Sequence, residues 1–213
     1  MDDMGERISF KSNGNAVDGY LAKPAEPGPA VIVIQEWWGL VPHIEHVADR
    51  FAAAGFVALA PDLFHGSTTK SPDQAAKLMM SLRIEEAARD LAGAVHYAAA
   101  LPKVTARKVG TIGSCMGALS LYAASQNPEI GACVVFYGGH PNVTPDLAAL
   151  QAPVLGLYAG KDTFVSPAVV SALDQQLADH AFFNDARPEV YDAAAAEDAW
   201  ARTLAFFRRE LNG

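Results

Sequence analysis

The sequence has few cysteines, no excess of basic residues and no long hydrophobic run. Its 213 residues include two cysteines, Cys115 and Cys133, which are too few for a disulfide framework and lack metal-site spacing. The formal net charge of −8 argues against nucleic acid or an anionic membrane as the main partner. No apolar stretch approaches the length of a membrane span, and Met1–Arg7 lacks the features of a signal peptide. These absences favour a cytoplasmic protein, where a thiol stays reduced.

The composition is that of an ordinary globular protein. A chain of 213 residues can bury a proper core, and no repeat or low-complexity tract divides it. We therefore expect residues 1–213 to form a single domain, as a monomer or a small homo-oligomer. His43 and His46 have no third ligand nearby, so we expect no metal site, and we expect no cofactor.

Short apolar runs alternate with amphipathic stretches along the chain. The runs predict buried strands at 30–34, 56–60, 108–113, 132–137 and 154–159, after a hairpin at 6–11 and 16–22. The amphipathic stretches predict helices at 43–54, from 71, at 83–100, up to 124, from 166 to about 178, and at 188–211. This alternation indicates an α/β fold, with a mostly parallel central sheet and helices on both faces.

The segment Gly113–Gly117 carries the strongest chemical signal. A β-branched run ends at Gly113, Cys115 follows, and a helical pattern begins after Gly117. Strand, sharp turn and helix, with the pattern glycine-x-nucleophile-x-glycine, are typical of a nucleophile elbow. A helix N-terminus favours a thiolate, so this geometry would also activate the cysteine. The alternative is a plain strand-to-helix connection with a buried structural thiol.

Other polar residues follow the predicted parallel strands, where function gathers in such sheets. They are Glu36, Asp62, His140 and Asp162. In an α/β-hydrolase the chain order is nucleophile, acid, histidine. Asp162 is placed for the acid, and only His180 follows it, so this order disfavours His140 as the base.

The chain resembles the dienelactone hydrolase family, or carboxymethylenebutenolidases, from about residue 6 to its end. The resemblance is carried by four short segments: Gln35–Gly39, Gly113–Gly117, Gly160–Asp162 and His180–Phe182. A cysteine elbow together with the upstream Gln-Glu pair is specific to this family. The resemblance implies an α/β-hydrolase fold and hydrolysis of a dienelactone to maleylacetate through an acyl-enzyme on sulfur.

The same resemblance implies roles for individual residues. Cys115 would be the nucleophile, His180 the base and Asp162 its orienter. Glu36 would lie near the thiol and help to form the thiolate when substrate binds. The backbone N–H groups of Met116 and Trp37 would form the oxyanion hole.

Glu36 can be judged on electrostatics as well. A carboxylate beside a thiol raises the pKa of the thiol, so Glu36 can help only by accepting the proton. The alternative is a strand-end carboxylate bonded to a basic side chain.

Three residues are candidates for substrate binding. Arg83 lies between the second buried strand and the elbow strand, where the family places anion-binding groups. The motif around it does not match well, so a surface helix arginine is the favoured alternative. Trp38 and Phe182 are candidate pocket walls, and each could equally be a core aromatic.

The interval from Asp162 to His180 departs from the family. A helix of about twelve residues descends roughly 18 Å, and a strand of about five or six residues should bring the chain back. No such strand is evident before His180, as if about a dozen residues were absent. A catalytically impaired relative that binds a small molecule therefore stays open. A general carboxylesterase or thioesterase stays open as well, because the same elbow serves other acyl substrates.

Overall fold

The computed structural model of the chain describes residues 5–12, 14–159, 175–176 and 181–211. Its centre is one eight-stranded sheet in the order β1-β2-β4-β3-β5-β6-β7-β8. The strands are β1 (Gly5–Ser12), β2 (Asn15–Ala22), β3 (Ala30–Ile34), β4 (Val57–Pro61), β5 (Val109–Ser114), β6 (Ile130–Phe136), β7 (Val154–Ala159) and β8 (Gln175–Gln176). The hairpin β1–β2 is antiparallel, as is its pairing with β4, and from β4 to β8 every pairing is parallel.

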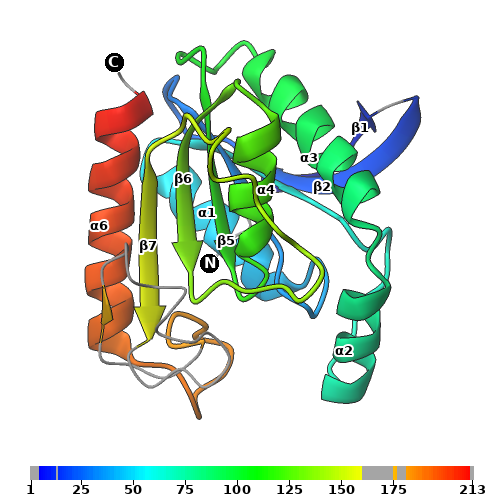
Figure 1. Cartoon of the computed structure of the whole chain (residues 1–213). Coiled ribbons are helices and arrows are strands. Elements are labelled where there is room, and N and C mark those ends of the chain that lie inside the picture. Colours follow the sequence, from blue (N-terminus) through cyan, green and yellow to red (C-terminus); the bar gives the residue numbers. More distant parts are fainter. Residues whose placement is uncertain (1–4, 13, 160–174, 177–180, 212–213) are drawn as a thin grey trace.

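Helices cover both faces of the sheet (Figure 1). They are α1 (Pro42–Ala53), α2 (Pro72–Ser81), α3 (Ile84–Ala99), α4 (Ala118–Gln126) and α6 (Ala193–Leu211). Residues of α1 and α6 pack in one hydrophobic cluster, and residues of α3 and α4 pack in the cluster on the other face. Helix α2 buries only Ala75 and projects from the body. The predicted α/β architecture is confirmed.

The central strands are apolar on both faces, which suits strands covered by helices on either side. Every residue of β3, β4 and β6 is buried. Their parallel register pairs Ile34 with Gly113, and Ser114 with Phe136. The carboxyl ends of β3, β5 and β6 therefore meet at one edge, to which the arrowheads of β5 and β6 point in Figure 1.

The helix predicted from 166 to about 178 is wrong at its end, because Gln175–Gln176 form the strand β8. Gln175 pairs with Tyr158 and Gln176 with Ala159, in parallel. Two glutamines carry no apolar or β-branched signal, and such a short strand is held by the open backbone edge of β7. A return strand thus exists before residue 180, although none was evident in the sequence.

The C-terminal helix begins at Ala193, later than the predicted Pro188. Residues 188–190 form a turn, and Asp192 Oδ1 accepts the Ala195 N–H at 3.0 Å. A side-chain cap of this kind satisfies a helix N–H that has no partner inside the helix, which fixes the start there.

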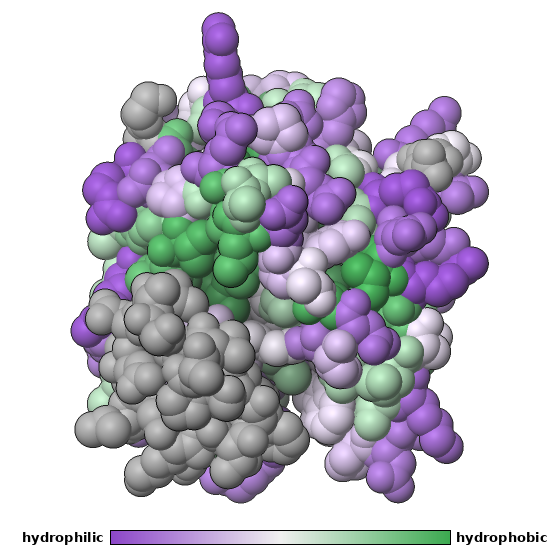
Figure 2. Space-filling view, in the orientation of Figure 1, coloured by the Kyte–Doolittle hydropathy of each residue, from purple (hydrophilic) through white to green (hydrophobic). Residues whose placement is uncertain are grey.

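The surface of one face is shown in Figure 2. Hydrophobic residues gather there in two areas, with hydrophilic side chains between and around them. Among the described residues no helix is both long enough and apolar enough to span a bilayer.

Candidate active site

Cys115 lies in the sharp turn between β5 and α4. Its φ angle is +60°, a left-handed conformation that non-glycine residues adopt rarely and mostly where surrounding structure enforces it. Two backbone hydrogen bonds fix the turn: Cys115 N–H donates to Phe136 O at 3.2 Å, and Gly139 N–H donates to Cys115 O at 2.9 Å. Both partners belong to β6 or the segment after it. This is the strained strand-turn-helix geometry of a nucleophile elbow.

The part-exposed Cys115 opens onto a pocket of about 550 Å³. The pocket walls come from the segments after β3, β5 and β6, from α2, and from Ala181 and Arg187. The lining residues are Glu36, Trp37, Trp38, Pro72, Met79, Cys115, Gly139, His140, Pro141, Ala181 and Arg187.

Glu36 is the buried carboxyl group of this pocket, with 2% of its surface exposed. Burial raises the pKa of Glu36 to about 7, while the Asn184 amide, the Arg187 charge and the Tyr137 hydroxyl oppose that rise. Asn184 Nδ2 donates to Glu36 Oε2 at 2.8 Å. A carboxyl group with this pKa can accept and return a proton near neutral pH.

Two backbone donors next to the pocket have no acceptor among the described residues. The N–H groups of Trp37 and Met116 make no hydrogen bond within the described part of the chain. Trp37 lines the pocket at the turn closed by Gly39 N–H and Glu36 O, and Met116 directly follows Cys115. Donors of this kind can bind a developing oxyanion.

The two other predicted triad members, Asp162 and His180, lie outside the described residues. Ala181, which follows His180 in the sequence, lines the Cys115 pocket. Strand β7 ends at Ala159, three residues before Asp162.

His140 also lines the pocket, although chain order disfavours it as the base. Its Nδ1 accepts the Asn142 N–H at 3.1 Å, and burial lowers its pKa. The neutral ring therefore carries its proton on Nε2. In the described part of the chain, no three His, Cys, Asp or Glu side chains come together as metal ligands would.

Of the three residues predicted to bind substrate, one lines the Cys115 pocket and two do not. Trp38 lines the pocket. Phe182 does not, because it is fully buried against Phe136 and Tyr137, with ring centroids 6.1 and 5.3 Å away. Arg83 does not line the pocket either.

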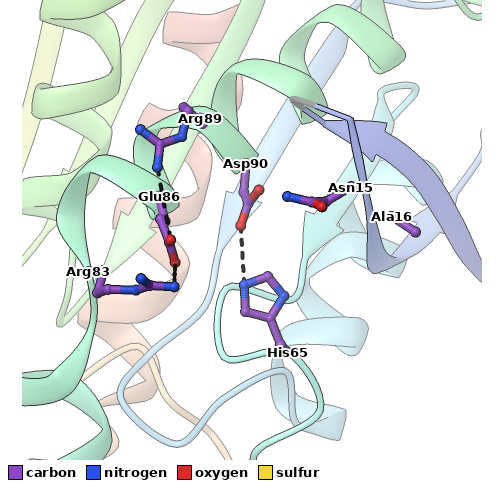
Figure 3. A pocket seen from close by; sticks show the side chains of 7 residues that line it. All are labelled: Asn15, Ala16, His65, Arg83, Glu86, Arg89 and Asp90. Atoms are coloured by element: carbon purple, nitrogen blue, oxygen red, sulfur yellow. Dashed lines mark ion pairs between the residues drawn. The ribbon is translucent and has the colours of Figure 1, made fainter.

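Arg83 lies at a different cavity, of about 370 Å³, between the start of α3 and the β1–β2 hairpin (Figure 3). Its Nη2 is 2.5 Å from Glu86 Oε2, and 76% of its side chain is exposed. Beside it His65 Nε2 is 3.3 Å from Asp90 Oδ2. The first turn of α3 pairs Arg83 with its i+3 neighbour, so it acts as a surface helix arginine.

Sequence reasoning missed Arg187 and Asn184. Both lie in the segment that follows His180, and a loop arginine or asparagine ordinarily suggests solvated surface. Only their distance of a few residues from His180 could have marked them. Arg187 is the one cationic side chain among the described residues that line the Cys115 pocket, and it pairs with Glu189 at 2.8 Å.

Comparison with known proteins shows which family the chain matches. A family model described as "Dienelactone hydrolase family" matches residues 17–211. "Protein usf" of Aquifex pyrophilus is 37% identical over 231 residues, covering 98% of this chain and 100% of that protein. A "Putative carboxymethylenebutenolidase" of Aquifex aeolicus is 34% identical over 230 residues, with 98% and 100% covered. Both alignments have more positions than the 213 residues here, so those relatives hold residues that this chain lacks.

A solved structure extends the similarity to three dimensions. The crystal structure of a "Putative Dienelactone Hydrolase" from Klebsiella pneumoniae superimposes with a TM-score of 0.86 and 30% identity. The match covers 96% of this chain and 98% of that one. With the elbow at Cys115 and the matching sheet, these similarities place the chain in the dienelactone hydrolase family, hydrolases of the α/β-hydrolase fold that act on esters.

Proposed function

We propose that this chain hydrolyses small lactones or esters through an acyl-enzyme on Cys115, with dienelactone to maleylacetate as the favoured reaction. One observation carries the proposal: Cys115 in the elbow and the buried Glu36 line one pocket, beside two backbone N–H groups without acceptors in the described chain. A nucleophile, a proton acceptor and oxyanion donors are the parts that acyl transfer needs.

The first half of the reaction forms the acyl-enzyme. Glu36 takes the proton of the Cys115 thiol, and the sulfur attacks the carbonyl carbon. The carbonyl oxygen becomes an oxyanion that the N–H groups of Trp37 and Met116 bind. When the carbon–oxygen bond of the ester breaks, the leaving oxygen takes the proton that Glu36 accepted, and the acyl group stays on sulfur.

The second half releases the acid. Water attacks the thioester carbonyl, His180 accepts a proton from that water, and Asp162 orients the imidazole. The position of Ala181 in the pocket wall supports this role for His180, its neighbour in sequence. The sulfur leaves as a thiolate and takes up the proton that His180 accepted, which restores the thiol of Cys115 and the neutral imidazole.

Arg187 takes the role that the sequence first suggested for Arg83. Its positive charge in the pocket wall suits a substrate that carries a carboxylate besides its ester bond. Trp37 and Trp38 supply apolar walls for the unsaturated part of such a molecule.

The test is turnover of dienelactone and of p-nitrophenyl acetate by the wild type and Cys115→Ala. We expect hydrolysis of both compounds, abolished by the substitution. Hydrolysis of the simple ester alone would keep the cysteine hydrolase and discard dienelactone as substrate. Wild-type turnover in the Cys115→Ala variant would refute the proposed nucleophile. A burst of product followed by slow turnover would indicate that deacylation, the His180 step, limits the rate.

A further inference from the structure

Asn184 joins two parts of the pocket that are far apart in sequence. Its side chain is buried, with 2% exposed, and its Nδ2 donates to Glu36 Oε2 at the end of β3. Its Oδ1 accepts the Ala186 N–H at 3.1 Å. Its backbone N–H donates to Ala181 O at 3.0 Å, and its backbone O accepts the Arg187 N–H at 3.1 Å. One residue thus holds the carboxyl group and the segment that carries Ala181 and Arg187.

The hydrogen bond to Asn184 makes the two oxygens of Glu36 unequal. Oε2 is occupied by the amide donor, whereas Oε1 is buried without a hydrogen bond of good geometry in the described chain. A buried carboxyl oxygen that lacks a donor gains most from receiving a proton. Oε1 is therefore the more basic of the two oxygens.

The charge of the groups around Glu36 also affects how readily it takes up a proton. The groups that face Glu36 are the Asn184 amide, the Arg187 guanidinium and the Tyr137 hydroxyl, and Tyr137 in turn faces Cys115. Asn184 makes the direct bond, and it is neutral. A neutral donor fixes the position of the carboxyl group without the strong stabilisation of its anion that a cation in contact would give.

We propose that Asn184 is a positioning residue for Glu36, which holds Oε2 so that Oε1 receives the Cys115 proton, and which links that carboxyl group to residues 181–187. The inference rests on the proposed function. In the step concerned the S–H bond of Cys115 breaks, an O–H bond forms at Glu36 Oε1, and the electron pair stays on sulfur.

Two substitutions separate the bond to Glu36 from the local turn. Asn184→Asp keeps an oxygen for the Ala186 N–H and replaces only the donor that faces Glu36. Asn184→Ala removes both interactions. Asn127 is a matched control, because its Oδ1 likewise accepts the N–H of the residue two positions later, Glu129, at 2.9 Å, outside the pocket.

The first measurement is the pH dependence of kcat/KM and of kcat for p-nitrophenyl acetate hydrolysis. Two carboxyl groups in contact share a proton, so Asn184→Asp should move the acidic limb of kcat/KM upward by about one pH unit or more. Asn184→Ala should lower kcat about tenfold or more with KM within about twofold, because Glu36 loses the bond that positions it. Asn127→Asp and Asn127→Ala should leave both profiles unchanged.

A merely structural role for Asn184 makes different predictions. Asn184→Asp would then match the wild type at every pH, because the turn is kept, and this result would overturn the proposal. If Asn184→Ala fails to fold, the comparison of Asn184→Asp with Asn127→Asp is sufficient to distinguish a positioning role from a structural one.

A second measurement does not depend on turnover. The carboxyl carbon of Glu36 is titrated by NMR in the full chain labelled with ¹³C-glutamate, with Glu36→Gln for assignment. The titration midpoint of Glu36 should be higher in Asn184→Asp than in the wild type, and equal midpoints would reject the positioning role of Asn184. Wild-type turnover in Cys115→Ala would instead reject the proposed function, so the two failures are distinct.

Discussion

Gly113 and Gly117 face each other so closely across the Cys115 turn that neither position has room for a side chain. A Cβ atom on Gly117 would lie 2.6 Å from Gly113 O, and one on Gly113 would lie 2.9 Å from Gly117 Cα. The end of β5 and the start of α4 can approach because both residues lack a Cβ. This contact supports the turn in which Cys115 adopts its positive φ angle.

Gly117→Ala should therefore destabilise the protein and abolish esterase activity. The φ angle of Gly117 is −59°, so the cost comes from the collision and not from the backbone conformation. Overpacking of this kind costs about 2 kcal/mol or more. Urea unfolding and p-nitrophenyl acetate hydrolysis measure the two effects.

Gly55→Ala is the control for that substitution. Gly55 has φ +95°, but a Cβ atom placed there would have no described atom within 4 Å, so Ala should cost about 1 kcal/mol and leave activity intact. Equal loss of activity in both variants would contradict the close contact as the cause.

Glu36→Gln should change how stability depends on pH. Burial raises the pKa of Glu36 from 4.5 to about 7 in the folded protein, so folding favours the protonated group. The stability that this preference gives, about 3 kcal/mol, is present below pH 4.5 and is lost as pH rises to about 7 and beyond. Gln cannot ionise, so the free energy of unfolding of the variant should rise relative to that of the wild type as pH increases over this range.

Urea unfolding at pH 4.5, 6 and 8 tests this difference. The exposed Glu26→Gln should follow the wild type at each pH. A constant difference in the free energy of unfolding between Glu36→Gln and the wild type at all three pH values would show that Glu36 does not titrate in this range.

The parts of the fold that the sequence predicted are those with strong local signals. The run Ala30–Ile34 is apolar and β-branched almost throughout, and it forms a strand buried on both faces. Gly113 and Gly117 bracket Cys115 because the turn needs them, so the elbow could be located from their spacing.

The parts that were missed depend on contacts between distant segments. Gln175–Gln176 become a strand only because β7 offers an open edge, which no local propensity encodes. Asn184 donates a hydrogen bond to Glu36 although the two residues are 148 positions apart in the sequence, and nothing in the local sequence of either residue predicts this contact. For Arg83 the favoured interpretation, a surface helix arginine, is confirmed by its exposed pair with Glu86, whereas the alternative of a substrate-binding arginine is not supported.

The two cysteines should react very differently with thiol reagents. Cys133 is fully buried in β6, and burial raises its pKa to about 12, while Cys115 is part-exposed at the pocket. Alkylation needs an accessible thiolate. Iodoacetamide should label Cys115 alone in the folded protein and both cysteines in urea, as measured by mass spectrometry of peptides. Labelling of Cys133 at the same rate as Cys115 without denaturant would contradict its burial.

Arg187→Ala and Arg83→Ala should separate the two arginines by their effect on charged substrates. Arg187 lines the Cys115 pocket, so its loss should raise KM about tenfold for a lactone that carries a carboxylate, since charge-assisted hydrogen bonds contribute about 1.5 kcal/mol or more. The neutral p-nitrophenyl acetate has no anion to bind, and its KM should stay within about twofold. Arg83 faces another cavity and pairs with Glu86, so Arg83→Ala should leave both KM values unchanged. The opposite pattern, with only Arg83→Ala raising KM for the charged lactone, would restore Arg83 as the anion-binding residue and reject Arg187.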